Sequence, residues 1–333
     1  MSGISVHTCL LFFSFFLLSA FFIVLATDQP VDYPEMSIEN DQIKLHLYLP
    51  DAEKGFYRGT RFDWSGMISR VDYQDHTFFG EWLTPHNPTN HDDVVGPCEE
   101  FGMQVPLGYP EAQVGETFIK IGIGHIEKVQ EEEYGFWKAY HLVKPAQWTI
   151  THGDDWIEFQ QELKDQRGWG YFYTKKIQIQ TGEPAFAIEH RLKNIGSKTI
   201  ETNFYNHNFV MIDEATIGKS YQMRFTFPAR ARRGLDQIAV IKDGVMIFEK
   251  NIEEKPLFSE IDGLKGTPED GHIIIENLKT GGGLKIEGDK APVKINFYAA
   301  KTAICPEPFL EMHLPPDSSF EWNLKYSFFE VSQ

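Results

Sequence analysis

The sequence predicts an all-β domain from three recurring features that begin near residue 40. Apolar and polar residues alternate over segments such as 43–49, 186–192 and 320–328, which is the period of half-buried antiparallel strands. Gly, Pro, Asn and Asp separate these segments, as expected of turns. No segment longer than ten residues keeps the 3.6-residue apolar period of a helix. We therefore expect strands as the main elements.

The composition is that of a folded chain with an acidic surface. Of the 333 residues, 42% are apolar and 14% aromatic. Since no linker-like segment interrupts residues 27–333, we expect them to form a single domain. Lys and Arg number 31 against 48 Asp and Glu, which gives a net charge of −17. Such a charge is unfavourable for binding phosphate backbones, so we expect no nucleic acid partner.

Residues 10–26 form an almost unbroken run of Leu, Phe and Ile without a charged side chain. Val24 and Ala26 occupy the positions where signal peptidase prefers small residues. We therefore expect residues 1–26 to be a signal peptide and the protein to be exported, periplasmic or extracellular. The alternative is an uncleaved membrane anchor over residues 10–26, the only case in which we expect contact with a membrane.

Two of the three cysteines, Cys98 and Cys305, follow the predicted signal peptide. Export would permit a disulfide between them. Two buried free thiols are the alternative, because the sequence does not give the separation of the two Cα atoms.

Residues 80–116 contain five prolines and few strand signals, so we expect a long ordered loop there. Loops of this length are usually functional, and Trp82 offers a surface on which a ligand can stack. We expect a substrate lid. The alternatives are a solvated acidic loop and a metal patch formed by His76, His86 and His91.

The segment FYNHNF, residues 204–209, carries a histidine among aromatic residues. If it is extended, Tyr205, His207 and Phe209 share one face and Asn206 lies on the other. A sugar suits such a face, because its C–H groups stack on rings while its hydroxyls need directional partners. The alternative is a core histidine that bonds to a backbone carbonyl.

A second candidate is Glu307, which lies between Pro306 and Pro308. The prolines restrict the backbone on both sides and would hold the carboxylate in place. The alternative is a rigid surface turn.

Together these segments resemble the aldose 1-epimerases, or galactose mutarotases. The resemblance lies in the order and spacing of three stretches, Arg191–Phe209, Val293–Pro308 and Ser319–Phe328. It implies a large antiparallel β-sandwich, which agrees with the strand pattern.

The resemblance also implies an isomerase that interconverts the anomers of a free sugar through its open-chain aldehyde. Glu307 matches the family's general base, which takes the C1 hydroxyl proton, and His207 matches the general acid, which protonates the ring oxygen. Only protons move, so the resemblance implies no metal and no cofactor. Export and the acidic charge favour a neutral carbohydrate substrate. The alternative is a non-catalytic carbohydrate-binding protein of the same fold.

The family pattern further implies an earlier histidine that is followed by glycine. His125 is the nearest candidate, although no glycine follows it; His152 has the glycine but lies later than expected.

An arginine that holds sugar hydroxyls is also implied, and the candidates are Arg58 and Arg61. If residues 56–61 are extended, these side chains lie on opposite faces and only one reaches the site. The remaining residues that we expect to bind the substrate are Tyr205, Asn206 and Trp82.

Overall fold

The computed structural model describes residues 32–332, which contain 23 strands and one 3-10 turn, η1 (Pro268–Gly271). The prediction of an all-β architecture is therefore confirmed. From Tyr33 onward the chain forms one compact unit. The predicted signal peptide lies outside the described residues. Within residues 32–332, no helix has the length and apolar character needed to cross a membrane.

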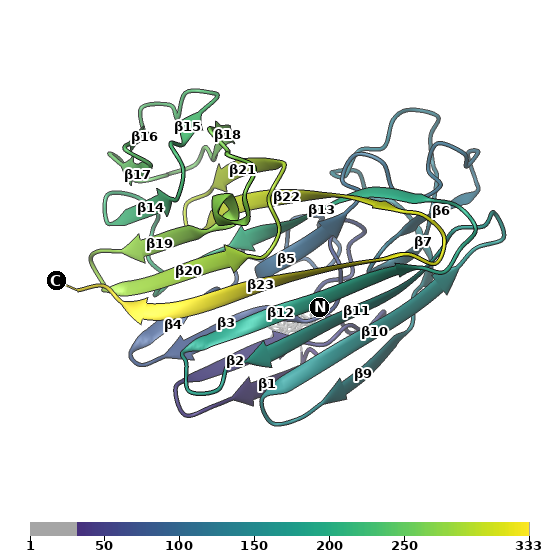
Figure 1. Ribbon diagram of the computed structural model, residues 1–333, viewed down its shortest axis with the longest axis horizontal. Helices are drawn as coiled ribbons and strands as arrows, with labels where there is room; N and C mark the ends of the chain where they lie inside the picture. Colours follow the sequence, from purple (N-terminus) through teal and green to yellow (C-terminus); the bar gives the residue numbers. More distant parts are fainter. Residues whose placement is uncertain (1–31, 333) are drawn as a thin grey trace, which may run out of the picture. The chain divides into compact units, whose positions relative to one another are not determined.

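The largest sheet has ten antiparallel strands in the order β16-β17-β14-β19-β20-β23-β12-β11-β10-β9. Figure 1 shows its long strands β23, β12, β11 and β10 side by side. The segments 43–49, 186–192 and 320–328 correspond to β2, β12 and β23, as the alternation predicts. The bounds in this sheet are β9 Trp148–His152, β10 Trp156–Lys164, β11 Gly170–Ile179, β12 Ala185–Asn194, β14 Tyr221–Phe225, β16 Ala239–Lys242, β17 Val245–Phe248, β19 Ile273–Asn277, β20 Gly282–Gly288 and β23 Ser319–Glu330.

A six-stranded antiparallel sheet, in the order β15-β18-β21-β22-β13-β5, carries most of the candidate site. Its bounds are β5 Gly96–Phe101, β13 Ile200–Phe209, β15 Arg230–Ala231, β18 Leu257–Asp262, β21 Lys294–Ala299 and β22 Ile304–Leu314. Two smaller sheets complete the fold, with the orders β1-β2-β3-β4 and β6-β7-β8. Their bounds are β1 Glu35–Glu39, β2 Ile43–Tyr48, β3 Met67–Tyr73, β4 His76–Phe78, β6 Thr117–Lys120, β7 Gly124–Glu127 and β8 Leu142–Pro145.

The main apolar core lies between the ten-stranded sheet and the sheets that face it. Ile188 on β12 and Tyr326 on β23 are fully buried there, together with Leu45 on β2 and Phe297 on β21. These residues come from the apolar phase of the alternation, which is why the strand pattern also predicts the core-facing side.

The prediction of a loop over residues 80–116 is wrong for Gly96–Phe101, which forms the fully buried strand β5 and pairs with β13. Its sequence, GPCEEF, lacks alternation because charged side chains are buried on both faces. Gly96 permits the approach of β5 to β3: its φ is +68°, and a Cβ there would lie 2.2 Å from the carbonyl oxygen of Ile68.

Of the two possibilities for the cysteines, the structure shows buried free thiols. Cys98 lies on β5 and Cys305 on β22, on opposite sides of β13. Two strand spacings separate them by about 10 Å. A disulfide needs a Cα separation below about 7 Å.

We predict that both thiols react with an alkylating reagent after denaturation without a reductant. In the native protein they should react slowly, because burial raises the pKa of each thiol. Peptide mapping by mass spectrometry measures both states. A disulfide-linked pair of peptides carrying Cys98 and Cys305 would contradict the prediction.

Candidate functional site

The register of β13 against β22 brings His207 and Glu307 together. Tyr205 lies opposite Phe309, so two residues further along β13 His207 reaches the level of Glu307. His207 Nε2 lies 3.1 Å from Glu307 Oε1. Each residue is only 5% exposed. The pair is thus a direct, buried contact between two titratable groups.

The two prolines create the space for this pair. Regular pairing of β13 with β22 ends at Tyr205, and a bridge between Val210 and Ile304 resumes it. Proline has no N–H to donate, so Pro306 and Pro308 cannot complete the ladder between those points. The side-chain amide of Asn208 donates to the carbonyl oxygen of Pro306 at 2.8 Å instead. The alternative of a rigid surface turn at Glu307 is therefore wrong.

Aromatic rings surround the His207 imidazole, as the predicted face of β13 requires. Phe209 stacks on it at a centroid distance of 4.1 Å, and Tyr298 and Phe62 present ring edges at 5.7 and 5.9 Å. One ring nitrogen contacts Glu307, while Nδ1 has no hydrogen-bond partner among the described residues. A core histidine that bonds to a backbone carbonyl is therefore not what the structure shows, and Nδ1 can bond to a ligand.

Burial shifts the pKa values of the two groups in opposite directions. Burial raises the pKa of the Glu307 carboxyl to about 7, although the Arg61 charge acts against it. Burial lowers the pKa of the His207 imidazole well below its ordinary value, and the Arg61 charge lowers it further. Both shifts favour the neutral forms. Between the lowered pKa of His207 and about pH 7, the pair therefore carries one titratable proton, located on Glu307.

Arg61 lies on the face of β13 that carries Tyr205 and His207, within a buried network of hydrogen bonds. Its Nε donates to Glu100 at 2.9 Å and its second terminal nitrogen to the Tyr205 hydroxyl at 2.8 Å. The Tyr205 hydroxyl donates to Glu100 at 2.6 Å, and Lys120 donates to the other carboxylate oxygen at 2.7 Å. Asp92, on the partly exposed side, forms an ion pair with Arg61. Tyr205 thus lies at the candidate site with its hydroxyl engaged.

Only one of the two candidate arginines reaches the site, but the predicted reason is wrong. Residues 56–61 form bends and irregular backbone and no strand. Arg58 points away, and its guanidinium bonds to the carbonyl oxygen of Glu53. Arg61 turns inward beneath Phe136, whose ring centroid lies 4.1 Å from the guanidinium carbon.

Trp82 lies over the aromatic wall of the site. Its ring stacks on Phe209 at 5.0 Å and meets Tyr298 edge to face at 6.3 Å. The indole nitrogen is buried and has no partner among the described residues. Trp82 therefore packs on Phe209 and Tyr298, the same two rings that contact the His207 imidazole.

Two other candidates do not reach the pair. Asn206 lies on the opposite face of β13, where its amide donates to Glu99 at 3.2 Å. That carboxylate also contacts His190 at 2.7 Å and Lys175 at 3.0 Å, in a fully buried cluster between the sheets. The structure places His125 on β7, where it is half-buried and burial lowers its pKa. The charged side chains near it are Asp165, Lys144 and Arg167, none of which belongs to the candidate site.

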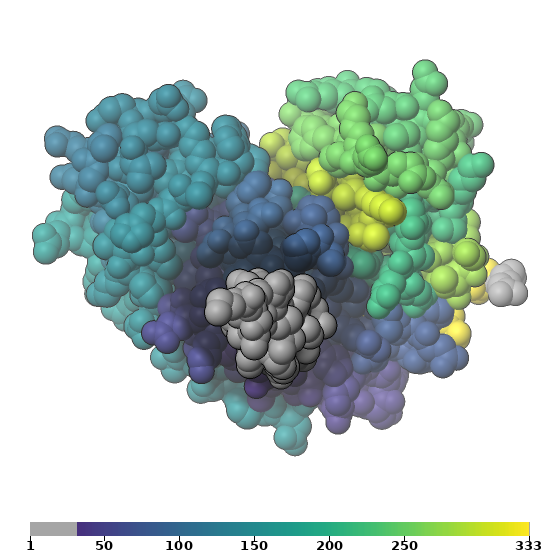
Figure 2. Space-filling model, turned by 180° about the vertical axis from the view of Figure 1, so that it is seen from behind, coloured from purple at the N-terminus to yellow at the C-terminus, as the bar shows by residue number. Residues whose placement is uncertain are grey.

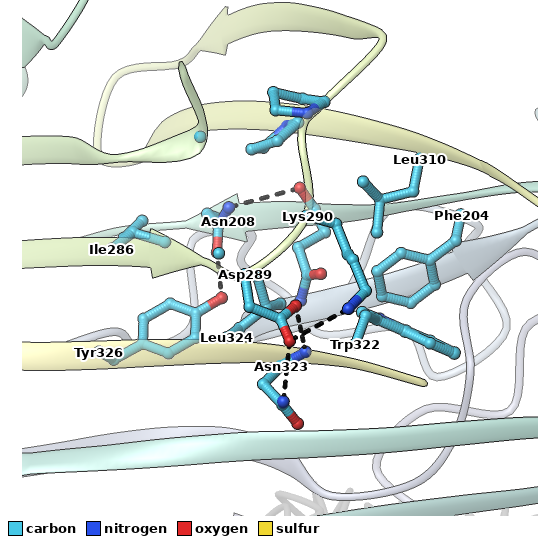
Figure 3. Close-up of a pocket in the computed structure, with 15 residues that line it drawn as sticks. Phe204, Asn208, Ile286, Asp289, Lys290, Leu310, Trp322, Asn323, Leu324 and Tyr326 are labelled. Carbon is cyan, nitrogen blue, oxygen red and sulfur yellow. Dashed lines mark hydrogen bonds and ion pairs between the residues drawn. The ribbon is translucent and has the colours of Figure 1, made fainter. Parts of the chain in front are cut away.

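The cavity on that opposite face is small. Figure 3 shows the side chain of Asn208 bonded to the Tyr326 hydroxyl, with Trp322 and Leu324 among the other side chains that line the space. The space has a volume of about 20 Å³, enough for about one water molecule. Asn206 and Asn208 therefore support the strands and do not face a ligand cleft.

The histidines of the possible metal patch lie in separate ion pairs, His76 with Asp213, His86 with Asp93 and His91 with Asp92. Among residues 32–332, no group of three or more His, Cys, Asp or Glu side chains is arranged to hold a metal ion.

Sequence reasoning missed Glu100, Lys120 and Asp92 as neighbours of the site. Glu99-Glu100 was visible as a pair of acids, but adjacent acids within a proline-rich segment indicate solvent exposure. Their burial depends on cations from distant segments, which no local pattern reveals.

The described chain has the galactose mutarotase-like fold. A galactose mutarotase-like protein from Clostridium acetobutylicum matches with a TM-score of 0.56 and 8% identity, covering 90% of this chain and 96% of that one. The GalM/aldose epimerase homologue from C. elegans matches with a TM-score of 0.54 and 12% identity, covering 90% and 100%.

A galactose mutarotase-like protein from Lactobacillus casei gives a TM-score of 0.53 at 10% identity, covering 89% of this chain and all of that one. No family model matches the sequence, and no curated protein matches it. At such identities the mutarotase-like similarity concerns the fold, so the chemistry depends on the site residues themselves.

We predict that Glu100→Gln destabilises the protein by about 3 to 5 kcal/mol, because it removes the buried anion between Arg61 and Lys120. Denaturant unfolding measures the change. Glu321→Gln is the matched control, because its ion pair with Arg191 is exposed and should contribute about 0 to 1 kcal/mol. Equal effects of the two substitutions would contradict the account of the network.

Proposed function

We propose that the chain is an exported aldose 1-epimerase-like enzyme that interconverts the anomers of a neutral sugar. The observation that best supports this proposal is the buried contact between His207 and Glu307 on the face where Arg61 and Trp82 also lie. Anomer exchange needs one proton donor and one proton acceptor at the two oxygens bonded to C1, the hydroxyl oxygen and the ring oxygen. A pair that holds one proton supplies both.

A bound sugar would replace the direct contact between the two side chains. Its C1 hydroxyl gives a proton to the unprotonated member, while the protonated member gives a proton to the ring oxygen. The C1–O5 bond then breaks and an aldehyde forms. After rotation about C1–C2 the ring closes, and both proton transfers reverse. Protons and charge balance within the pair at each step.

The location of the proton decides which residue acts first. The family resemblance assigns the acid role to His207 and the base role to Glu307. The pKa shifts favour the opposite starting form in the unliganded protein, with the proton on Glu307. Arg61 and Asp92 lie beside the pair and can hold ring hydroxyls, since Asp92 is partly exposed. A carboxylate and a guanidinium together suit a neutral polyhydroxy ligand.

A sugar can reach the pair only if neighbouring side chains move. His207 and Glu307 are each 5% exposed, and Trp82 stacks on Phe209, the ring that lies against the His207 imidazole. We propose that the segment around Trp82 is a substrate lid. The proposal of export depends only on the apolar run over residues 10–26.

A second candidate is a carbohydrate-binding protein without catalysis. The observation in its favour is the 3.1 Å contact itself, because side chains that lie against each other are partly occupied before a sugar arrives. The two functions differ in one property: only the enzyme accelerates anomer exchange.

We predict that the protein accelerates the mutarotation of at least one aldose and that Glu307→Gln or His207→Asn lowers kcat by about a hundredfold or more, because each removes one proton-transfer group. Polarimetry of freshly dissolved α-glucose and α-galactose measures the rate. Glu311→Gln, the same change at an exposed position of β22, is the control and should leave the rate unchanged. Wild-type protein that fails across a panel of aldoses would rule out the enzyme.

We also predict that kcat/KM falls as the pH rises through about 7, where the unliganded pair loses its single titratable proton. Toward acid the rate should persist until the pH is well below the ordinary pKa of histidine, because burial lowers the pKa of His207. The pH dependence of kcat/KM between pH 4 and about 9 tests this expectation. A rate that increases steadily above pH 7 would contradict the one-proton pair.

A further inference from the structure

A cavity of about 700 Å³ lies beside the candidate site and is not used by the proposed chemistry. Its walls come from the loops that follow β5 and β7, around Val105, Tyr109 and residues 131–137. In Figure 2 this part of the chain (blue to teal) forms a lobe that faces a second lobe (green), with yellow C-terminal segments between them. A volume of this size falls within the range of small-molecule sites.

Trp137 gives the cavity an exposed aromatic surface. All seven tryptophans lie in the described part of the chain, and Trp137 is the one among them whose side chain is exposed, at 60%. Phe136 supports it edge to face at 5.1 Å. A single exposed ring is common on protein surfaces, but this one lines a cavity of ligand size, where a bound molecule could stack on it. The C–H face of a sugar is a natural cover for such a ring.

Polar groups of mixed charge surround this ring. Lys128 is 5% exposed and donates to the carbonyl oxygens of Ala112 and Tyr109, which leaves one of its three N–H groups without a partner among the described residues. The buried Tyr134 hydroxyl also has no partner in that range. Residues 131–133 add three exposed carboxylates, one of which pairs with Lys138.

This mixture favours a neutral polyhydroxy ligand over a cation. A polyamine would be attracted by exposed, solvent-screened carboxylates but repelled by the buried ammonium of Lys128. Sugar hydroxyls can accept from Lys128 and donate to carboxylates at the same time.

Phe136 joins the cavity to the candidate site. It lines the cavity, while its ring lies over the Arg61 guanidinium at 4.1 Å and near the His91 ring at 6.4 Å. A ligand that fills the cavity would therefore lie next to Phe136. Phe136 in turn contacts Arg61, which lies beside His207 and Glu307.

We propose that this cavity is a carbohydrate subsite that binds the second unit of a reducing oligosaccharide, with Trp137 as the stacking surface. That the subsite is oriented toward the anomeric centre rests on the proposed function. That a saccharide binds at Trp137 does not rest on it. The substrate class is thus a short oligosaccharide with a free reducing end.

The test compares the binding of cellobiose, maltose and lactose with that of glucose and galactose by isothermal titration calorimetry, using the full chain. We expect at least one disaccharide to bind more tightly than its component monosaccharides. Trp137→Ala should lower the affinity for that disaccharide about tenfold, as expected for loss of an aromatic contact, and leave monosaccharide binding unchanged. Trp137→Phe should restore part of the affinity.

Trp156→Ala is the matched control, because Trp156 is a partly exposed tryptophan on β10 that contacts Lys176. It should leave disaccharide affinity unchanged. The subsite is overturned if no disaccharide binds more tightly than its monosaccharides, if Trp137→Ala binds the disaccharide as wild type does, or if spermidine rather than saccharide binds in a Trp137-dependent manner.

Mutarotation of glucose and galactose by the same preparations separates the two proposals. Trp137-dependent disaccharide binding without mutarotation would overturn the enzyme and retain the subsite. If the protein catalyses mutarotation but Trp137→Ala leaves disaccharide binding unchanged, the subsite is overturned and the enzyme is retained.

Discussion

The register of β13 between β5 and β22 is the constraint on which the candidate site depends. It places His207 beside Glu307 on one side and beside Cys98 on the other. Because side chains alternate along a strand, a slip of one residue would bring Asn206 to this face and turn the histidine toward the interior between the sheets. The core fixes the register, since Phe204 on the opposite face is buried against Trp322.

Two carboxylates on this face show how neighbours determine the state of a buried acid. Burial raises the pKa of Glu100, but the Lys120 ammonium and the Arg61 guanidinium outweigh burial and lower it below its ordinary value. Glu307 has no such cation in contact, so burial prevails and its pKa rises to about 7. One acid is thus a permanent anion that holds the network together, and the other titrates near neutral pH, as acid/base chemistry requires.

The sequence predicts the parts of this structure that depend on local pattern. Alternation reveals β2, β12 and β23, and it assigns Tyr205, His207 and Phe209 to one face of an extended segment. It misses β5, because the charges that neutralise Glu99 and Glu100 come from residues far along the chain. It also leaves a surface turn open at Pro306 and Pro308, because prolines are exceptional inside a central strand; here Asn208 supplies a substitute bond. Local pattern cannot specify such long-range compensation.

The central claim is that His207 and Glu307 together act on the anomeric centre of a sugar. A crystal structure of the protein with bound galactose or glucose tests it most directly. The account predicts that Trp82 is displaced from Phe209 and that the C1 hydroxyl and the ring oxygen each lie within hydrogen-bond distance of one member of the pair. A bound sugar whose anomeric carbon lies away from both side chains, with the His207–Glu307 contact intact, would contradict it.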